Sequence, residues 1–268
     1  MAFLGLFNYS KPGPGVDKGE TNKNRFFYFW ELYFRKFWKL IELNILYILV
    51  CIPIVTIGPA TAGLVYVLRN YADVRSTFLM HDFFQAFKKN FKQSIAIFFL
   101  DLLATGIVMF SFVFYWQNAS YSKLMFIPLG GCVLAFILLS FMRYYTYLMA
   151  VTVDLKLKHI IKNAFIFSFV GLKTNFFTAL FTVVIMVLLV VVPYLYLLFP
   201  ILLGFSTIWF ITVYNSYPYI VRYIVTPYEE KKGVSEQESE DAIFTDIGSA
   251  ERAVAQTKTK SAKGRVIK

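Results

Sequence analysis

Long apolar runs separated by short polar segments fill the chain between residues 40 and 222. The clearest runs are Phe98–Phe114, Leu124–Met142 and Phe176–Val192. A helix that crosses the hydrocarbon core of a bilayer needs about 20 mostly apolar residues, and these runs are too long and too pure for core helices of a soluble domain. The pattern therefore predicts an all-α integral membrane protein.

The number of spans depends on residues 41–70, where the pattern allows either one kinked helix or a helical hairpin. Pro53 and Pro59 lie near the middle, and proline breaks or kinks a helix because it lacks an N–H and clashes with the preceding turn. A hairpin places the basic segments 69–93 and 155–173 on the side of the N-terminus, as the positive-inside rule favours. We therefore predict six spans with both termini in the cytoplasm, with a re-entrant segment as the alternative for the short second span. The predicted spans lie near 40–56, 58–74, 94–116, 124–149, 174–194 and 198–222.

Each predicted hairpin follows an aromatic, basic stretch whose apolar residues recur on one helical face. Such a stretch is typical of an amphipathic helix in the membrane interface, with its apolar side toward the acyl chains. Each hairpin also has a Pro/Gly element at its expected turn and an Arg among tyrosines on its returning helix. These shared features predict a threefold internal repeat, unless the aromatic-belt and positive-inside rules create the likeness unaided. The amphipathic stretches are 26–39, 77–92 and 157–173, the Pro/Gly elements are 53–59, 128–131 and 200–204, and the arginines are Arg69, Arg143 and Arg222.

Charge and composition agree with this class of protein. The chain is 58% hydrophobic and has a mean hydropathy of +0.59. Its net charge of +11 fits basic cytoplasmic loops, and no base-reading motif accompanies it, so nucleic acid is not an expected partner. Cys51 and Cys132 lie within apolar runs and are expected to be small buried hydrophobes.

The chain divides by composition into three parts. Residues 1–25 form a turn-rich cytoplasmic linker, 26–226 the transmembrane domain, and 227–268 a charged cytoplasmic tail expected to be disordered. The tail has a docking candidate at Ile243 and Phe244 and a basic end suited to anionic membrane lipid.

Asp101 is the main candidate for chemistry, because a carboxylate inside a span is costly and normally faces a partner or a water-filled cavity. It lies about eight residues into the third predicted span, or about 12 Å from its inner edge. Arg143 lies at a similar depth on the fourth predicted span. We expect an Asp101–Arg143 ion pair, either as a lock between two helices or, less favoured, as part of an ion or proton path.

Other polar and small residues are assigned to helix contacts. Asn44 is expected to hydrogen-bond a neighbouring helix. Arg69 and Arg222 are expected to anchor their helices at the cytoplasmic interface, Arg69 by snorkelling. A cluster of small and helix-breaking residues predicts close helix packing, with an unwound, substrate-exposing segment as the alternative. This cluster consists of Pro53, Thr56, Gly58, Pro59 and Gly63.

Motifs for catalysis or cofactor binding do not stand out. His81 and His159 have no second ligand at metal spacing, and the sequence contains no phosphate-binding glycine loop and no Ser, His and acid cluster. The sequence therefore predicts a protein that is not an enzyme and has no metal or cofactor.

Several segments resemble the YesL-like family of bacterial integral membrane proteins, over roughly residues 3–222. The segments are Gly5-Leu-Phe-Asn-Tyr9, Phe37-Trp-Lys-Leu-Ile-Glu-Leu-Asn44, Ile52-Pro-Ile-Val-Thr-Ile-Gly-Pro-Ala-Thr-Ala-Gly63 and Asp82-Phe-Phe-Gln-Ala-Phe-Lys-Lys-Asn-Phe-Lys92. The resemblance implies a multi-pass protein of a Gram-positive plasma membrane, encoded beside carbohydrate importers of the ATP-binding-cassette (ABC) type.

This resemblance makes a non-enzymatic accessory subunit of such an oligosaccharide importer the leading functional expectation, with the permease subunits as partners. The sequence lacks the Glu-Ala-Ala loop by which a permease docks its ATPase, which argues against direct coupling to ATP hydrolysis. A stand-alone transporter or channel with Asp101 in its path, and a membrane partner of a sugar-responsive sensor kinase, are the alternatives.

Overall fold

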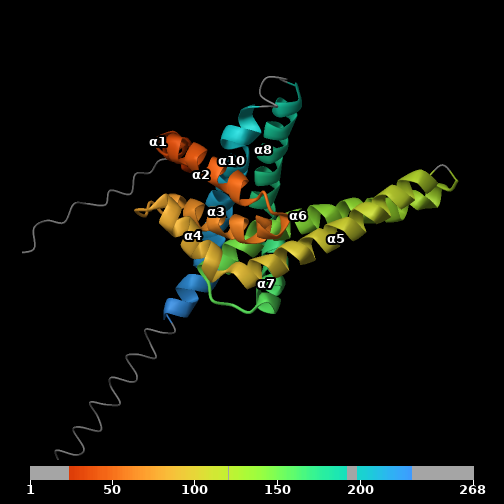
Figure 1. The fold of residues 1–268 in the computed structure, drawn as a ribbon. Coiled ribbons are helices and arrows are strands. Elements are labelled where there is room, and N and C mark those ends of the chain that lie inside the picture. Colours follow the sequence, from red (N-terminus) through yellow and green to blue (C-terminus); the bar gives the residue numbers. More distant parts are fainter. Residues whose placement is uncertain (1–23, 120, 192–197, 231–268) are drawn as a thin grey trace, which may run out of the picture. The chain divides into compact units, whose positions relative to one another are not determined.

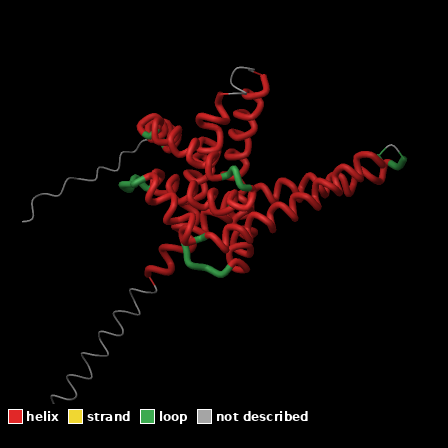
Figure 2. The backbone as a smooth tube through the Cα atoms, viewed as in Figure 1, coloured by secondary structure: helices red, strands yellow, loops and turns green. Residues whose placement is uncertain are grey.

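The computed structural model describes residues 24–119, 121–191 and 198–230, and in them helices make up nearly all of the chain and no strand occurs (Figures 1 and 2). Two helices are long and apolar enough to cross a membrane: α5 (Phe91–Asn118), and α6 (Phe126–Thr152) with the short 3-10 turn before it. A third candidate is the pair α7 (Leu157–Val170) and α8 (Leu172–Val191), which is bent by 88°. These helices support a helical membrane protein.

Contacts divide the chain into residues 1–37 and 38–268, which are described separately. In the first part, α1 (Arg25–Arg35) carries a row of aromatic side chains at helical spacing. Trp30 stacks on Phe34 with ring centroids 5.8 Å apart, and Phe29 lies 6.0 Å from Tyr33. Residues four apart share one helix face, so the amphipathic pattern of the sequence becomes one aromatic ridge.

The second part begins with two helices separated by a short break, α2 (Phe37–Val50) and α3 (Ile57–Ala72). The chain leaves the α-helical path at Cys51 and resumes it at Ile57, and the Tyr47 hydroxyl lies 3.2 Å from Thr61 Oγ1 across the break. The chain therefore bends sharply between Cys51 and Thr56, and residues 41–70 form two separate helices. At 16 residues, α3 is about 24 Å long, shorter than the core of a typical bilayer.

Helix α3 is the most enclosed helix of this second part. It packs against α4 (Leu79–Lys89), α5, α6 and α10 (Phe205–Ile220). Two glycines allow the close approach: a Cβ added at Gly58 would stand 2.9 Å from the Ser94 carbonyl carbon of α5, and one at Gly63 would stand 2.9 Å from the Phe83 carbonyl oxygen of α4. Small residues let helix backbones come close in membrane proteins, and here they form the centre of the bundle.

The returning helices α3, α6 and α10 pack against one another, and each also contacts helices of another hairpin. Helix α3 packs on α4 and α5, α6 packs on α7 and α8, and α10 contacts α2. Within residues 38–268, each returning helix therefore contacts helices outside its own hairpin.

A common backbone break precedes the first helix of every hairpin. The dihedral angles are φ −104° and ψ 10° at Lys36, −100° and 11° at Asn90, and −90° and 14° at Gly171. Residues seven and four before each break, and four and seven after it, are all at most 8% exposed. They are Phe29, Leu32, Leu40 and Leu43 in the first copy, Phe83, Ala86, Ser94 and Ile97 in the second, and Ala164, Phe167, Asn175 and Thr178 in the third. One local design thus occurs three times.

Two details differ from the expectations drawn from the sequence. In the apolar stripe of α4, expected to face acyl chains, Phe83 is buried where α4 packs against α3, whereas Met80 and Phe84 are exposed. Residues 128–131 and 200–204 are helical and do not form turns. Pro128 lies in the first turn of α6, where a missing N–H costs no hydrogen bond, so it marks the start of a helix.

The chain ends also differ in part from the predicted boundaries. Helical structure continues from the π-helical segment Val221–Val225 to Glu230, beyond the expected start of the tail at residue 227. The docking candidates Ile243 and Phe244, and most of the linker 1–25, lie outside the described residues.

Candidate functional site

The structure brings Asp101 of α5 and Arg143 of α6 side by side. Arg143 donates to Asp101 Oδ1 from Nη2 at 3.0 Å and from Nε at 3.2 Å. Its Nη2 also donates to Thr105 Oγ1 at 3.1 Å, a partner that sequence reasoning missed although it follows Asp101 by one helical turn. The pair lies about 15 Å from the start of α5 and at a similar distance from the end of α6, so the two residues share one depth.

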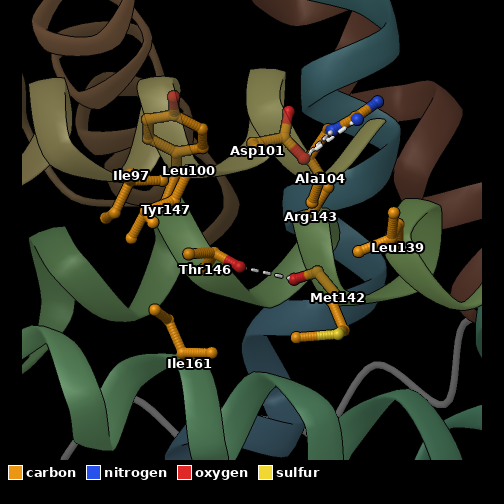
Figure 3. A pocket seen from close by; sticks show the side chains of 10 residues that line it. All are labelled: Ile97, Leu100, Asp101, Ala104, Leu139, Met142, Arg143, Thr146, Tyr147 and Ile161. Atoms are coloured by element: carbon orange, nitrogen blue, oxygen red, sulfur yellow. Dashed lines mark hydrogen bonds and ion pairs between the residues drawn. The ribbon is translucent and has the colours of Figure 1, made fainter. Parts of the chain in front are cut away.

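An apolar cavity of about 240 Å³ lies beside this pair, between α5, α6 and α7 (Figure 3). Figure 3 shows Asp101 and Arg143 on one side of the cavity and Ile161 of α7 on the other. The remaining lining residues are Ile97, Leu100 and Ala104 of α5 and Leu139, Met142, Thr146 and Tyr147 of α6. Thr146 gives its hydroxyl proton to the Met142 carbonyl of its own helix, so the ion pair supplies the charge of the cavity wall.

Asn44, expected to bond a neighbouring helix, joins α2 to the start of α10. Its Nδ2 donates to the carbonyls of Pro200 at 3.0 Å and Ile201 at 2.8 Å, and its Oδ1 accepts from the Ser206 N–H at 2.9 Å. These backbone groups belong to or follow the π-helical segment Pro200–Gly204, where the regular hydrogen-bond ladder shifts. A fully buried carboxamide therefore satisfies backbone groups beside a helix irregularity.

A second buried carboxamide, which sequence reasoning missed, braces the bend between α7 and α8. Asn175 Nδ2 donates to the Ser168 carbonyl at 3.2 Å, and its Oδ1 accepts from the Tyr145 hydroxyl of α6 at 2.7 Å. The last carbonyls of a helix have no intrahelical donor, so a side chain at the bend supplies one. The signal was available: Asn175, like Asn44, is a lone carboxamide near the inner end of an apolar run.

Arg69 is only 8% exposed, which differs from the expected snorkelling position. Its Nη1 donates to the Val151 carbonyl at 2.9 Å, its Nη2 to Asn70 Oδ1 at 2.9 Å, and its guanidinium lies 4.5 Å from the centre of the Tyr66 ring. Val151 is in the last turn of α6, where a cation is favoured by the helix dipole and by unsatisfied carbonyls. The buried Arg69 guanidinium therefore links α3 to the end of α6.

The other expected anchor, Arg222, is exposed, and its guanidinium lies 5.6 Å from the centre of the Tyr223 ring. Its membrane-anchoring role stays a prediction.

The cluster Pro53, Thr56, Gly58, Pro59 and Gly63 is split by the start of α3. Thr56 donates to the Val50 and Pro53 carbonyls and closes the turn. From Ile57 onward the chain is α-helical, so the unwound alternative does not hold for the two glycines and Pro59. Gly58 and Gly63 instead lie at close helix contacts, as described above.

Groups for metal or thiol chemistry are sparse in the described residues. Within them, no three His, Cys, Asp or Glu side chains gather closely enough to hold a metal ion. Cys51 and Cys132 are free and half-buried.

Comparison with known proteins adds one match. No curated protein and no solved structure matches the chain. The sequence family described as "Protein of unknown function, DUF624" matches residues 40–112, which hold most of α2, all of α3 and α4, and most of α5, and the YesL proteins are members of that family.

Proposed function

We propose that this chain is a non-enzymatic accessory subunit that packs beside the permease of a bacterial carbohydrate ABC importer. The observation that carries this proposal is that buried polar side chains of the bundle hydrogen-bond the backbone of neighbouring helices. Asn44, Asn175 and Arg69 are buried and engage backbone carbonyls of neighbouring helices. Polar groups that line a transport path must stay available to water or substrate, whereas these three are committed to holding helices together.

The surface of the α5–α6 hairpin supports a packing role. Leu103 of α5 is 62% exposed and Leu134 of α6 is 69% exposed, along helices that contact each other. A lipid-embedded subunit can offer such apolar faces to acyl chains or to the helices of a partner. The link to carbohydrate uptake comes from the resemblance to YesL-like proteins, with which the family match over residues 40–112 agrees.

Gentle detergent extraction of the tagged full chain from its native membrane tests this role. Quantitative mass spectrometry is expected to recover permease and ATPase subunits in stoichiometric amounts. Recovery of the chain alone, or with a sensor kinase in their place, contradicts the proposal.

A second candidate, a small transporter or channel, is favoured by the cavity beside Asp101 and Arg143. In this reading the pair lies on the path of the transported species. Uptake of a carbohydrate or ion by the purified protein in liposomes, abolished in a folded Asp101→Asn variant, supports transport and removes the lock interpretation of the pair.

The proposed arrangement has six spans in the plasma membrane with both termini in the cytoplasm. Cysteines placed at Lys88 and Lys158, in a chain without Cys51 and Cys132, are expected to resist an impermeant thiol reagent on intact cells. A cysteine at Tyr121, in the opposite loop, is expected to react. Labelling at position 88 or 158 contradicts the topology whatever the partner is.

A further inference from the structure

The ion pair beside the cavity leaves hydrogen-bonding atoms open. Arg143 uses Nε and Nη2 for Asp101 Oδ1 and Thr105. Among the described residues, Arg143 Nη1 and Asp101 Oδ2 have no hydrogen-bond partner. The two side chains are 34% and 30% exposed, so a molecule from outside can reach them.

Open polar atoms are costly at this depth. Helices α5 and α6 are the clearest candidate spans in the described residues, and the pair lies about 15 Å from the start of α5 and at a similar distance from the end of α6. A donor or acceptor without a partner is strongly unfavourable in hydrocarbon, so a polar group of another molecule is expected to meet these atoms.

The cavity restricts the chemistry of that molecule. Its wall is apolar except near the pair, and the pair is neutral overall because the guanidinium balances the carboxylate. A charged ligand would add an uncompensated charge to a medium of low dielectric constant, whereas a neutral one avoids this penalty. One open atom is a donor and the other an acceptor, and they lie apart because Nε and Nη2 are the atoms that face Asp101. A headgroup with two hydroxyls, each of which can accept and donate, can therefore meet both atoms.

The route of entry favours a lipid over a water-soluble molecule. Leu100, which lines the cavity, is 45% exposed on a helix long and apolar enough to cross a bilayer, so acyl chains are expected beside the cavity. Phospholipid headgroups are charged and stay at the surface. An uncharged lipid with a free hydroxyl can sink its polar group to this depth, because no ionic charge has to be desolvated.

We propose that this cavity binds the two hydroxyl groups of a neutral lipid of the monoacylglycerol class. Arg143 Nη1 donates to the oxygen of one hydroxyl, the other hydroxyl donates to Asp101 Oδ2, and the acyl chain lies against Leu100, Leu139 and Ile161. This site goes beyond the accessory role proposed above and does not depend on it.

The test compares two probes that share one acyl chain. The purified full chain is titrated in detergent with 1-oleoylglycerol and with methyl oleate, which lacks a hydroxyl, and the bound probe is quantified by native mass spectrometry. Hydrogen bonds to two charged groups predict at least about tenfold tighter retention of 1-oleoylglycerol. Equal retention of the probes, or no retention of either, overturns the proposal without any need for a variant.

Two variants that each introduce a phenylalanine ring locate the site. Ala104→Phe adds a ring at the cavity wall and removes no atom of the ion pair, so the preference for 1-oleoylglycerol is expected to disappear. Ile127→Phe, at a 73% exposed position near the other end of α6, is the matched control and keeps the preference. An Ala104→Phe protein that is folded and still prefers 1-oleoylglycerol places the binding elsewhere and overturns the proposal.

Discussion

Helix α3 and the α5–α6 hairpin show two opposite uses of apolar sequence. In α3, Leu64 and Leu68 are fully buried by protein, and the helix contains glycines, threonine, asparagine and arginine. In the hairpin, apolarity is nearly unbroken, yet Phe110 is 76% exposed. Apolarity in a membrane protein therefore reports contact with lipid, whereas burial by protein is marked by small residues and by polar groups that find partners.

The largest effect expected for a polar side chain comes from removing the buried carboxamide that joins α2 to α10. Asn44→Leu leaves two carbonyls and one N–H without their side-chain partner, at about 1 kcal/mol or more for each group. We expect a loss of about 3 kcal/mol in the free energy of unfolding, measured by denaturant titration in mixed micelles.

The matched control is Asn118→Leu at the tip of the hairpin. Asn118 donates only to the Phe114 carbonyl of its own helix, in an exposed bond, and its loss is expected to cost less than about 0.5 kcal/mol. If both variants lose the same amount, the carboxamide of Asn44 does not brace the core.

The next prediction compares the same substitution, glycine to alanine, at Gly58 of α3 and at Gly131 of α6. Gly58→Ala places a Cβ 3.0 Å from Phe98 Cβ and closer still to the Ser94 backbone, so α3 and α5 must separate, at a cost of about 1–3 kcal/mol. At Gly131 a Cβ meets nothing within 4 Å, and alanine there is expected to stabilise the helix by about 0.5–1 kcal/mol. Thermal unfolding in detergent is expected to shift in opposite directions, and shifts of the same sign contradict the difference between the two regions.

Much of the helical layout was readable from the sequence, because the signals are local. Apolar runs of sufficient length predicted α5 and α6, and Pro53 predicted the break between α2 and α3. The six spans and their sidedness, which were argued from the distribution of charge, stay predictions. The depth of Asp101 and Arg143 predicted their pairing, since two spans joined by a short loop run antiparallel and bring equal depths together.

What the sequence left open depends on contacts between distant segments. The burial of Arg69 requires the end of α6 to lie beside α3, and neither local pattern contains that information. The helical state of Pro200 was missed because proline and glycine mark helix starts and π-helical segments as well as turns. The cavity needs three helices at once, so no single stretch encodes it.

A smaller effect on the free energy of unfolding is expected for the Asp101–Arg143 ion pair, which joins α5 to α6 by a polar contact. A double-mutant cycle of Asp101→Asn and Arg143→Gln is expected to give a coupling of about 0.6–1.7 kcal/mol, as found for hydrogen-bonded pairs between membrane helices. The pair is partly exposed, so its contribution stays below that of Asn44. A coupling of zero in the same micelles removes the lock interpretation and favours the role of the pair in a path or a ligand site.

The smallest effect on the free energy of unfolding is expected at the exposed surface of the α5–α6 hairpin. Phe110 makes few protein contacts at 76% exposure, so Phe110→Ala is expected to change the free energy of unfolding in detergent by less than about 0.5 kcal/mol. Leu64→Ala, at a fully buried position of α3, is expected to cost about 2–5 kcal/mol in the same assay. A large loss from Phe110→Ala means that protein covers this side chain in solution, by self-association of the hairpin or by the segments outside the described residues. Analytical ultracentrifugation of the wild-type chain separates these causes, because only self-association raises the protein mass and makes the loss depend on protein concentration.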